Sequence, residues 1–219
     1  MTDQPFRKIY AIGDIHGCLG QLEQLIPMLP IQREEDLLLF IGDYIDRGPD
    51  SKGVVDYVLH LRETLCPTVC LIGNHEQMFL DYLTGVEKYT FLYNGGEETL
   101  LSYGLIDKKD TTIEDLPPRH ADFFRNLEHY YETDDYVFVH AGLRPGVPLS
   151  RQSDYDMIWI RFDFIRSDYD FGKTIIFGHT PLSRSEPFQG VKKIGIDTGA
   201  VYGGRLTCLE LPGKRIYQV

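Results

Sequence analysis

Five short, mainly apolar runs along the chain are each followed at once by a cluster of glycine and polar residues. The runs are Ile9–Ile12, Leu37–Ile41, Val69–Ile72, Tyr136–Val139 and Thr174–Phe177. Runs of this length, bounded by turn residues, predict β-strands. The carboxyl ends of neighbouring strands in α/β proteins meet at one edge of a sheet. We therefore expect the five polar clusters to converge at that edge.

Helical periodicity fills the segments between the first three runs. The expected helices span 18–28, 51–61 and 78–83, and later strands are expected at 193–196 and 205–211. Ser51 is the predicted N-cap of the second helix. Asp14 and Asp43 lie 29 residues apart, and Asp43 and Asn74 lie 31 apart. A strand, a crossover helix and a return strand need roughly 30 residues, so this spacing predicts consecutive βαβ units.

The regular alternation of predicted strands and helices does not continue between Gly85 and Asp134. Within this segment, Asn94-Gly95-Gly96 and Pro117-Pro118 each precede an expected helix. The segment is too small to bury a core of its own well. We therefore expect a single domain over residues 1–219, with residues 85–134 as a helical insertion that forms a lid or a wall of the cleft.

The polar clusters are motifs of residue types that bind metals or phosphate. They read Gly13-Asp14-Ile15-His16-Gly17, Gly42-Asp43-Tyr44-Ile45-Asp46-Arg47-Gly48, Gly73-Asn74-His75-Glu76, His140-Ala141-Gly142 and Gly178-His179-Thr180. Mixed oxygen and imidazole donors suit Mn²⁺, Fe²⁺ or Zn²⁺ better than Mg²⁺ or Ca²⁺. Six donors exceed the needs of one tetrahedral ion, and a carboxylate can bridge two ions, so the pattern predicts two metals. The candidate ligands are Asp14, His16, Asp43, Asn74, His140 and His179.

Four further residues would complete phosphoryl chemistry. Arg47 carries a planar guanidinium that can grip two phosphate oxygens. His75 is a candidate general acid, and Asp46 is placed to orient its ring. Arg161 lies in a strand-like aromatic run, Trp159-Ile160-Arg161, and is a candidate for a second phosphate clamp.

Composition narrows the classes of partner. The net charge of −11 over 219 residues argues against nucleic-acid binding, which usually needs a basic face. An acidic surface also repels phosphate, so local cations would have to make the electrostatic potential positive where a phosphate binds. No apolar stretch approaches the roughly 20 residues of a membrane span, and the N-terminus lacks a secretory signal. The four cysteines are Cys18, Cys66, Cys70 and Cys208. We interpret them as small buried residues in a reducing cytosol, and we therefore expect a cytoplasmic protein.

Taken together, the motifs resemble those of the phosphoprotein phosphatases within the calcineurin-like metallophosphoesterases, above all the small bacterial and bacteriophage enzymes of the lambda type. The likeness runs from residue 9 to about residue 209 and includes Asn94-Gly95-Gly96, Trp159-x-Arg161 and Ile196-Asp197-Thr198-Gly199-Ala200. The resemblance implies an α/β fold with a central β-sandwich of two mixed sheets flanked by helices. It also implies that the metals lie at one edge of the sandwich.

The same resemblance implies roles for the candidate residues. One ion would be held by Asp14, His16 and a bridging Asp43, and the other by Asp43, Asn74, His140 and His179. Manganese is the expected metal, with iron, zinc, nickel and cobalt as alternatives. Arg47, Arg161 and Asn74 would bind the phosphate. His75, oriented by Asp46, would protonate the departing alkoxide, and no phosphoenzyme would form.

We expect a phosphatase that hydrolyses phosphoserine and phosphothreonine in proteins or peptides, with phosphotyrosine as a further candidate substrate. A hydroxide bridging the two ions would attack phosphorus directly, and no regulatory subunit is implied. A dinucleoside tetraphosphate hydrolase is the first alternative. Asp46 and Glu76 argue against its symmetrical form, which typically carries alanine and aspartate at these positions. A phosphate-binding or scaffold protein without turnover is the second alternative.

Overall fold

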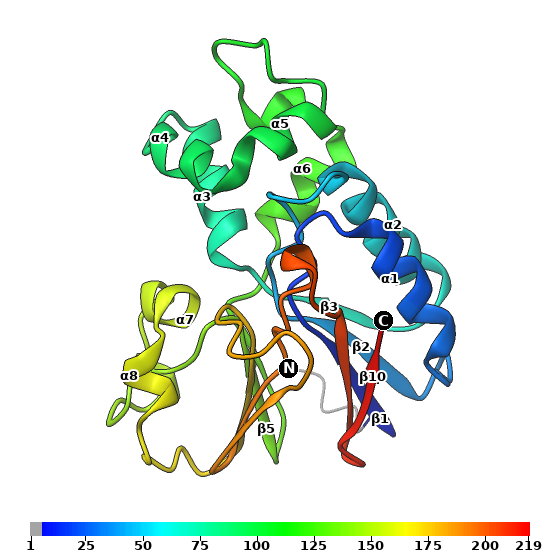
Figure 1. Cartoon of the computed structure of the whole chain (residues 1–219), viewed down its shortest axis with the longest axis vertical. Coiled ribbons are helices and arrows are strands. Elements are labelled where there is room, and N and C mark those ends of the chain that lie inside the picture. Colours follow the sequence, from blue (N-terminus) through cyan, green and yellow to red (C-terminus); the bar gives the residue numbers. More distant parts are fainter. Residues whose placement is uncertain (1–5) are drawn as a thin grey trace.

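The computed structural model describes residues 6–219, and in that range two mixed β-sheets lie face to face (Figure 1). The first has the strand order β10-β9-β1-β2-β3, and the second has the order β4-β5-β6-β8-β7. The strands are β1 Lys8–Ile12, β2 Asp36–Phe40, β3 Thr68–Cys70, β4 Tyr130–Glu132, β5 Tyr136–Val139, β6 Thr174–Phe177, β7 Phe188–Gly190, β8 Lys193–Gly195, β9 Thr207–Leu211 and β10 Arg215–Gln218. The predicted sandwich of two mixed sheets is confirmed.

The strands that precede the motifs run parallel within each sheet. β1 pairs with β2 and β2 with β3, while β5 pairs with β6 and β6 with β8. Antiparallel strands form the rest of each sheet: β9 and β10 continue the first beyond β1, and β4 and β7 are the outer strands of the second. Because the parallel strands share a direction, their carboxyl ends open at one edge of the sandwich, as the sequence predicts.

Alternation along the strands separates the hydrophobic core into layers. In β1, Ala11 faces the second sheet, whereas Tyr10 and Ile12 face the helices. In β2, Leu39 faces the second sheet and Phe40 faces the helices. Side chains two apart share a face of a strand, so both faces of these central strands are buried. This explains why the strands appear in the sequence as unbroken apolar runs.

Helices cover both outer faces of the sandwich (Figure 1). They are α1 Leu19–Leu25, α2 Ser51–Thr64 and α3 Asn74–Leu83 beside the first sheet, and α7 Asp154–Trp159 and α8 Phe162–Ile165 beside the second. The predicted cap of α2 is wrong by one residue, because Asp50 is the N-cap and accepts from the Gly53 N–H at 2.7 Å. Among the described residues, no helix has both the length and the apolar character needed to cross a membrane.

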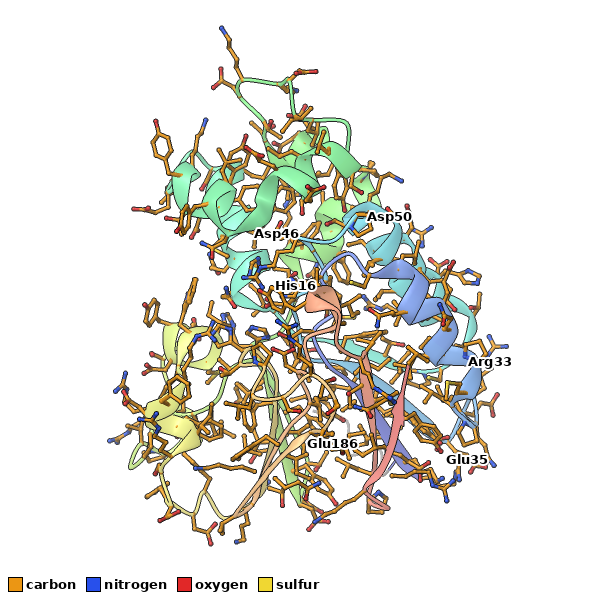
Figure 2. All side chains as sticks on the ribbon, viewed as in Figure 1. His16, Arg33, Glu35, Asp46, Asp50 and Glu186 are labelled. Atoms are coloured by element: carbon orange, nitrogen blue, oxygen red, sulfur yellow. The ribbon has the colours of Figure 1, made fainter. Side chains whose placement is uncertain are left out.

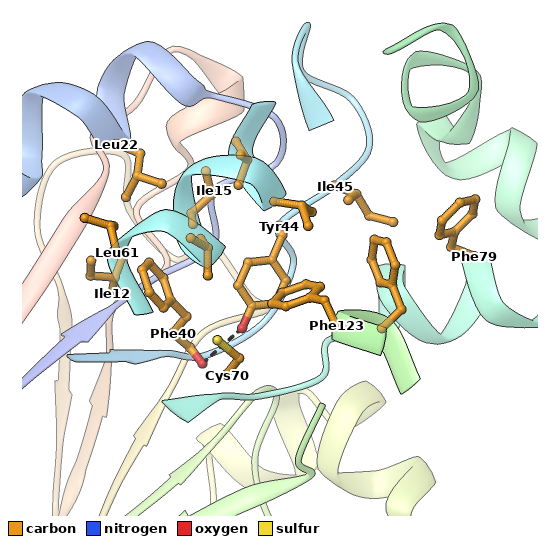
Figure 3. Packing of buried hydrophobic residues seen from close by; sticks show 14 of the residues in the cluster. Ile12, Ile15, Leu22, Phe40, Tyr44, Ile45, Leu61, Cys70, Phe79 and Phe123 are labelled. Carbon is orange, nitrogen blue, oxygen red and sulfur yellow. Dashed lines mark hydrogen bonds between the residues drawn. The ribbon is translucent and has the colours of Figure 1, made fainter. Parts of the chain in front are cut away.

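The segment 85–134 is largely helical and packs onto the first layer of helices. It contains α4 Lys88–Phe91, a π-helical turn at Leu92–Gly96, α5 Glu97–Ser102 and α6 Pro118–Arg125, and its last part forms β4. Figure 3 shows Tyr44 between Phe40 of β2 and Phe123 of α6. The Tyr44 and Phe123 rings meet edge to face at 5.1 Å. The insertion therefore shares one hydrophobic cluster with the sheet and has no separate core within the described residues.

Candidate metal and phosphate site

The five motifs come together at the carboxyl edge of the sheets, below the insertion, where Figure 2 labels His16 and Asp46. Two groups of potential ligands form there, one of His16, Asp43 and His75 and the other of Asp43, His140 and His179. Within each group the ligand atoms lie within 4.8 Å of one another. Asp43 belongs to both groups, which is the placement expected of a carboxylate shared by two ions. The division of ligands between two ions stays a prediction.

The Nε2 atom of His140 faces two side-chain oxygen atoms with its lone pair. Its Nδ1 lies 2.9 Å from the Ile41 carbonyl oxygen, which can only accept, so Nδ1 carries the proton. Burial lowers the pKa of His140 and keeps the ring neutral. Its Nε2 then points a lone pair at Asn74 Oδ1 (3.1 Å) and Asp43 Oδ1 (3.4 Å). A bound cation would turn this repulsion between acceptors into coordination.

Two more buried imidazoles lie at the same edge, His179 and His16. Within the described part of the chain, His179 Nε2 is buried and has no hydrogen-bond partner. His16 donates through Nδ1 to the Ile45 carbonyl (2.8 Å), so its Nε2 accepts from Arg47 (2.8 Å). Burial lowers the pKa of His16 to about 3, so this ring is neutral at physiological pH. Neutral imidazoles are the form that binds metals.

Buried carboxylates crowd the same place. Burial, together with the charges of Asp197 and Asp43, raises the pKa of Asp14. Asp43 is also buried, and its two carboxylate oxygens lie 3.3 Å from His16 Nε2 and 3.4 Å from His140 Nε2. Buried acidic groups and neutral imidazoles gathered in one place fit divalent cations, which would supply positive charge there. The donor set therefore fits the predicted metals.

Strained backbone is concentrated in these motifs. His16, Asp43, Asp46, Arg47 and His179 all have φ between 48° and 70°, in the left-handed region that side chains disfavour. Each such residue costs roughly 1–3 kcal/mol and persists only where surrounding contacts hold it. Strain of this kind is typical of functional sites.

Glycines in the motifs allow close approach of the ligands. An added Cβ at Gly178 would lie 2.1 Å from Asp14 Oδ1, and one at Gly73 would lie 2.1 Å from Asp43 Oδ1. Neither distance is tolerable for a real carbon atom. The two glycines are therefore required by the positions of these carboxylates rather than by turn geometry alone.

The two candidate phosphate-binding arginines line one cleft of about 350 Å³. Its lining residues are Arg47, Arg161, His179, Pro181, Arg184, Asp197 and Tyr202. Arg161 Nη1 donates to the His179 carbonyl at 3.2 Å, which holds the guanidinium beside a candidate ligand. The predicted strand-like setting of Arg161 is wrong, because Trp159 ends α7 and Arg161 immediately precedes α8. Ile160 and Arg161 form the short connection between the two helices.

The candidate general acid is held by the residue predicted to orient it. His75 Nδ1 lies 2.6 Å from Asp46 Oδ2, and both side chains are buried. The oxygen accepts the Nδ1 proton, which leaves Nε2 of His75 available to the site. Burial raises the pKa of Asp46, and the hydrogen bonds from His75 and Thr99 oppose that shift.

Several residues of this edge received no role from the sequence. Asp197, Arg184 and Tyr202 line the cleft, and Thr99 contacts Asp46. Glu76 accepts from the backbone N–H groups of Asp43 and Gly73. Glu76 and Asp197 stand within recognised motifs, but only the tertiary contacts show what their carboxylates do. Thr99 is 53 residues from Asp46, and no local pattern connects them.

Fold and site together define a metal-dependent phosphoesterase, a hydrolase. The chain belongs to the calcineurin-like phosphoesterase family, whose model matches residues 7–204. The resemblance noted from the motifs is therefore confirmed.

Relatives differ in what they act on. Serine/threonine-protein phosphatase 1 of Salmonella typhimurium is 35% identical over 94% of this chain and 93% of its own length. The asymmetrical bis(5'-nucleosyl)-tetraphosphatase PrpE of Bacillus cereus is 27% identical over 95% of this chain and 92% of its own. A solved structure provisionally assigned as a diadenosine tetraphosphatase superposes with a TM-score of 0.75 at 24% identity, covering 100% of this chain and 95% of that one.

Proposed function

We propose that the protein is a phosphatase for phosphoserine and phosphothreonine monoesters, with two divalent ions, manganese foremost, as its cofactors. The observation that carries this proposal is the buried contact between His75 and Asp46 at 2.6 Å. An alkoxide is a poor leaving group and needs a proton as the P–O bond breaks. A nucleotide released from a phosphoanhydride leaves as a stable anion and needs none. A fixed general acid beside the cleft therefore favours ester substrates.

The candidate ligands and arginines take complementary parts in this proposal. The donors around Asp43 would hold the ions, which when bound supply a hydroxide nucleophile near neutral pH and neutralise charge at phosphorus. Arg47 and Arg161 line the cleft and would bind the equatorial phosphate oxygens together with Asn74. His75 would donate its Nε2 proton to the leaving oxygen. The arginines and ions also account for phosphate binding by a protein of net charge −11.

The comparison with relatives supports the same choice. The similarity to the Salmonella serine/threonine phosphatase is 35%, against 27% for the tetraphosphatase, at nearly equal coverage. Phosphorylated proteins or peptides are therefore the proposed substrates.

The test replaces the acid and varies the leaving group. In His75→Asn, kcat on a phosphoserine peptide with Mn²⁺ should fall by about 10²–10⁴-fold, the range for a lost general acid. Hydrolysis of p-nitrophenyl phosphate, whose leaving group is stable as an anion, should fall much less. His60→Asn, an exposed change on α2, is the matched control and should leave both rates unchanged. Near-full activity of His75→Asn on the peptide would refute the assignment.

One observation favours a second function, hydrolysis of dinucleoside tetraphosphates. Arg184 brings a third guanidinium to the cleft lined by Arg47 and Arg161, which suits a chain of phosphates. The similarity to PrpE points the same way. Diadenosine tetraphosphate and the phosphoserine peptide, assayed side by side with Mn²⁺, distinguish the two functions. A higher kcat/KM on the tetraphosphate that is insensitive to His75→Asn would establish the second.

A further inference from the structure

Thr99 of the insertion contacts the Asp46 side chain from the face opposite His75. Its side chain is fully buried, and its hydroxyl donates to Asp46 Oδ1 at 2.5 Å. Asp46 Oδ2 meanwhile accepts from His75 Nδ1 at 2.6 Å. The two carboxylate oxygens are thus held by two different elements, α3 through His75 and α5 through Thr99. A chain of hydrogen bonds runs from the insertion to the candidate general acid.

The hydrogen bonds of the Thr99 hydroxyl are complete. Besides donating its one proton to Asp46 Oδ1, it accepts from the Asp46 backbone N–H at 2.9 Å. Ser51 Oγ lies 3.0 Å away and fills its remaining lone pair as a donor. A hydroxyl has one donor and two acceptor positions, so none is spare. An apolar side chain in place of this hydroxyl would leave the buried Asp46 Oδ1 without its donor.

The insertion also holds the strained backbone around Asp46. Asp46 and Arg47 have φ values of 70° and 68° in succession. The Arg47 N–H donates to the Gly95 carbonyl at 3.0 Å, and the Asp46 N–H donates to Thr99 and Ser51. Two consecutive residues in this region need such external contacts to stay there. The π-helical turn and α5 together supply them.

The insertion is fixed to the body of the protein near this contact. Ser102, one turn beyond Thr99 on α5, accepts from the Lys52 N–H at 2.9 Å and donates to Asp50 at 3.3 Å. Leu100 lies in the same buried cluster as Tyr44. Moving α5 away from the body of the protein would expose core residues and break these hydrogen bonds. We therefore interpret α5 as a packed wall of the site.

We propose that Thr99 is a positioning residue for the general acid. By fixing the Asp46 carboxylate, it sets the orientation of the His75 ring toward the leaving oxygen. The inference rests on the proposed phosphomonoesterase function and extends it to the insertion, whose α5 completes the acid rather than covering the substrate. Thr99 itself touches neither the candidate ligands nor the cleft-lining residues among the described contacts.

The decisive experiment combines Thr99→Val with substrates of different leaving groups. Valine keeps the shape but removes the hydroxyl, so kcat on a phosphoserine peptide should fall by about 10–10²-fold, the cost of misplacing a catalytic group. KM and the rate on 2,4-dinitrophenyl phosphate, which leaves without a proton, should change less than about threefold because that step needs no general acid. Thr99→Ser, which retains the hydroxyl, should restore the peptide rate.

Ser102→Ala is the matched control, because it loosens the same helix without touching Asp46 among the described contacts. It should lower the urea midpoint but leave the ratio of peptide to dinitrophenyl rates unchanged. A double-mutant cycle of Thr99→Val and His75→Asn adds a second measurement. Its rates are normalised to the folded fraction, so partial unfolding of a variant does not affect the result. In the His75→Asn background, Thr99→Val should cost nothing further on the peptide.

The outcomes separate the inference from the proposed function. A wild-type protein inactive on the phosphoserine peptide overturns the function and the inference with it. An active wild type in which Thr99→Val slows both substrates equally, or in which Ser102→Ala reproduces its selective defect, overturns the inference alone. Additive losses from Thr99→Val and His75→Asn also overturn it. A selective, serine-rescued loss that vanishes without His75 supports it.

Discussion

Replacing Glu76 by glutamine tests whether a buried carboxylate holds the site together. Glu76 is fully buried, and its Oε2 accepts from the N–H groups of Asp43 (2.8 Å) and Gly73 (2.9 Å). Its Oε1 accepts from the N–H groups of Tyr44 at 2.8 Å and Ile45 at 3.4 Å. One side chain therefore joins the loop after β2 to the first turn of α3. These two segments carry Asp43 and Asn74.

The magnitude follows from the count of donors. A glutamine amide has a single oxygen, so its NH₂ group would face either the N–H groups of Asp43 and Gly73 or those of Tyr44 and Ile45. Two buried donors are then left unpaired, at about 1–3 kcal/mol each. Glu76→Gln should therefore lower the free energy of unfolding by about 2–6 kcal/mol. Glu98→Gln, an exposed change on α5, should stay within about 0.5 kcal/mol of wild type.

The assay is urea unfolding of the protein in EDTA, with metal content measured separately. EDTA removes the contribution of bound ions, so the difference in stability between the variants does not include metal binding. Metal uptake by Glu76→Gln should also weaken, because Asp43 and Asn74 lose their common anchor. A Glu76→Gln variant as stable as Glu98→Gln in EDTA would refute the reasoning, since it would show that these N–H groups find other partners.

Two further changes probe the ligands directly. Chelation should abolish phosphatase activity and lower the melting temperature, since ions at a hundred times their Kd stabilise the protein by about 2.7 kcal/mol per site. An activity assay and scanning calorimetry, each performed before and after Mn²⁺ is restored, measure the two effects. Gly178→Ala should reduce the metal bound per chain, because its Cβ would lie 2.1 Å from Asp14 Oδ1. Gly20→Ala in α1, where nothing lies within 4 Å, should instead gain about 0.5–1 kcal/mol. Equal metal content in the two alanine variants would contradict the packing at Gly178.

The parts of the fold that the sequence predicts are those with a local cause. The central strands are buried on both faces, so β1 and β2 appear as continuous apolar runs. Their motifs follow at once, and the edge of a parallel sheet brings together residues as far apart as Asp14 and His179, whose N–H donates to Asp14 at 3.0 Å. Sequence order and sheet geometry suffice for that convergence.

The parts that the sequence misses have a tertiary cause. The outer strands β7 and β10 are three and four residues long and have no apolar run, so pairing with a neighbour defines them. The sequence predicts a strand-like run at Trp159-Ile160-Arg161, but Ser153 caps α7 by accepting from the Asp156 N–H, and that helix ends at Trp159. Tertiary hydrogen bonds also give Glu76 and Thr99 their places, across 32 or more residues.

The strained backbone of the motifs depends on residues that received no role from the sequence. The motifs can be read from the sequence because they hold ligands, but their backbone at Asp43, Asp46 and Arg47 is unfavourable in isolation. Residues outside the cleft offset that cost: Glu76 accepts from Asp43, and the insertion accepts from Asp46 and Arg47. Substitutions at these supports should therefore alter metal binding and proton transfer before they alter the fold. The insertion, which has the weakest sequence signal, is in this view part of the site.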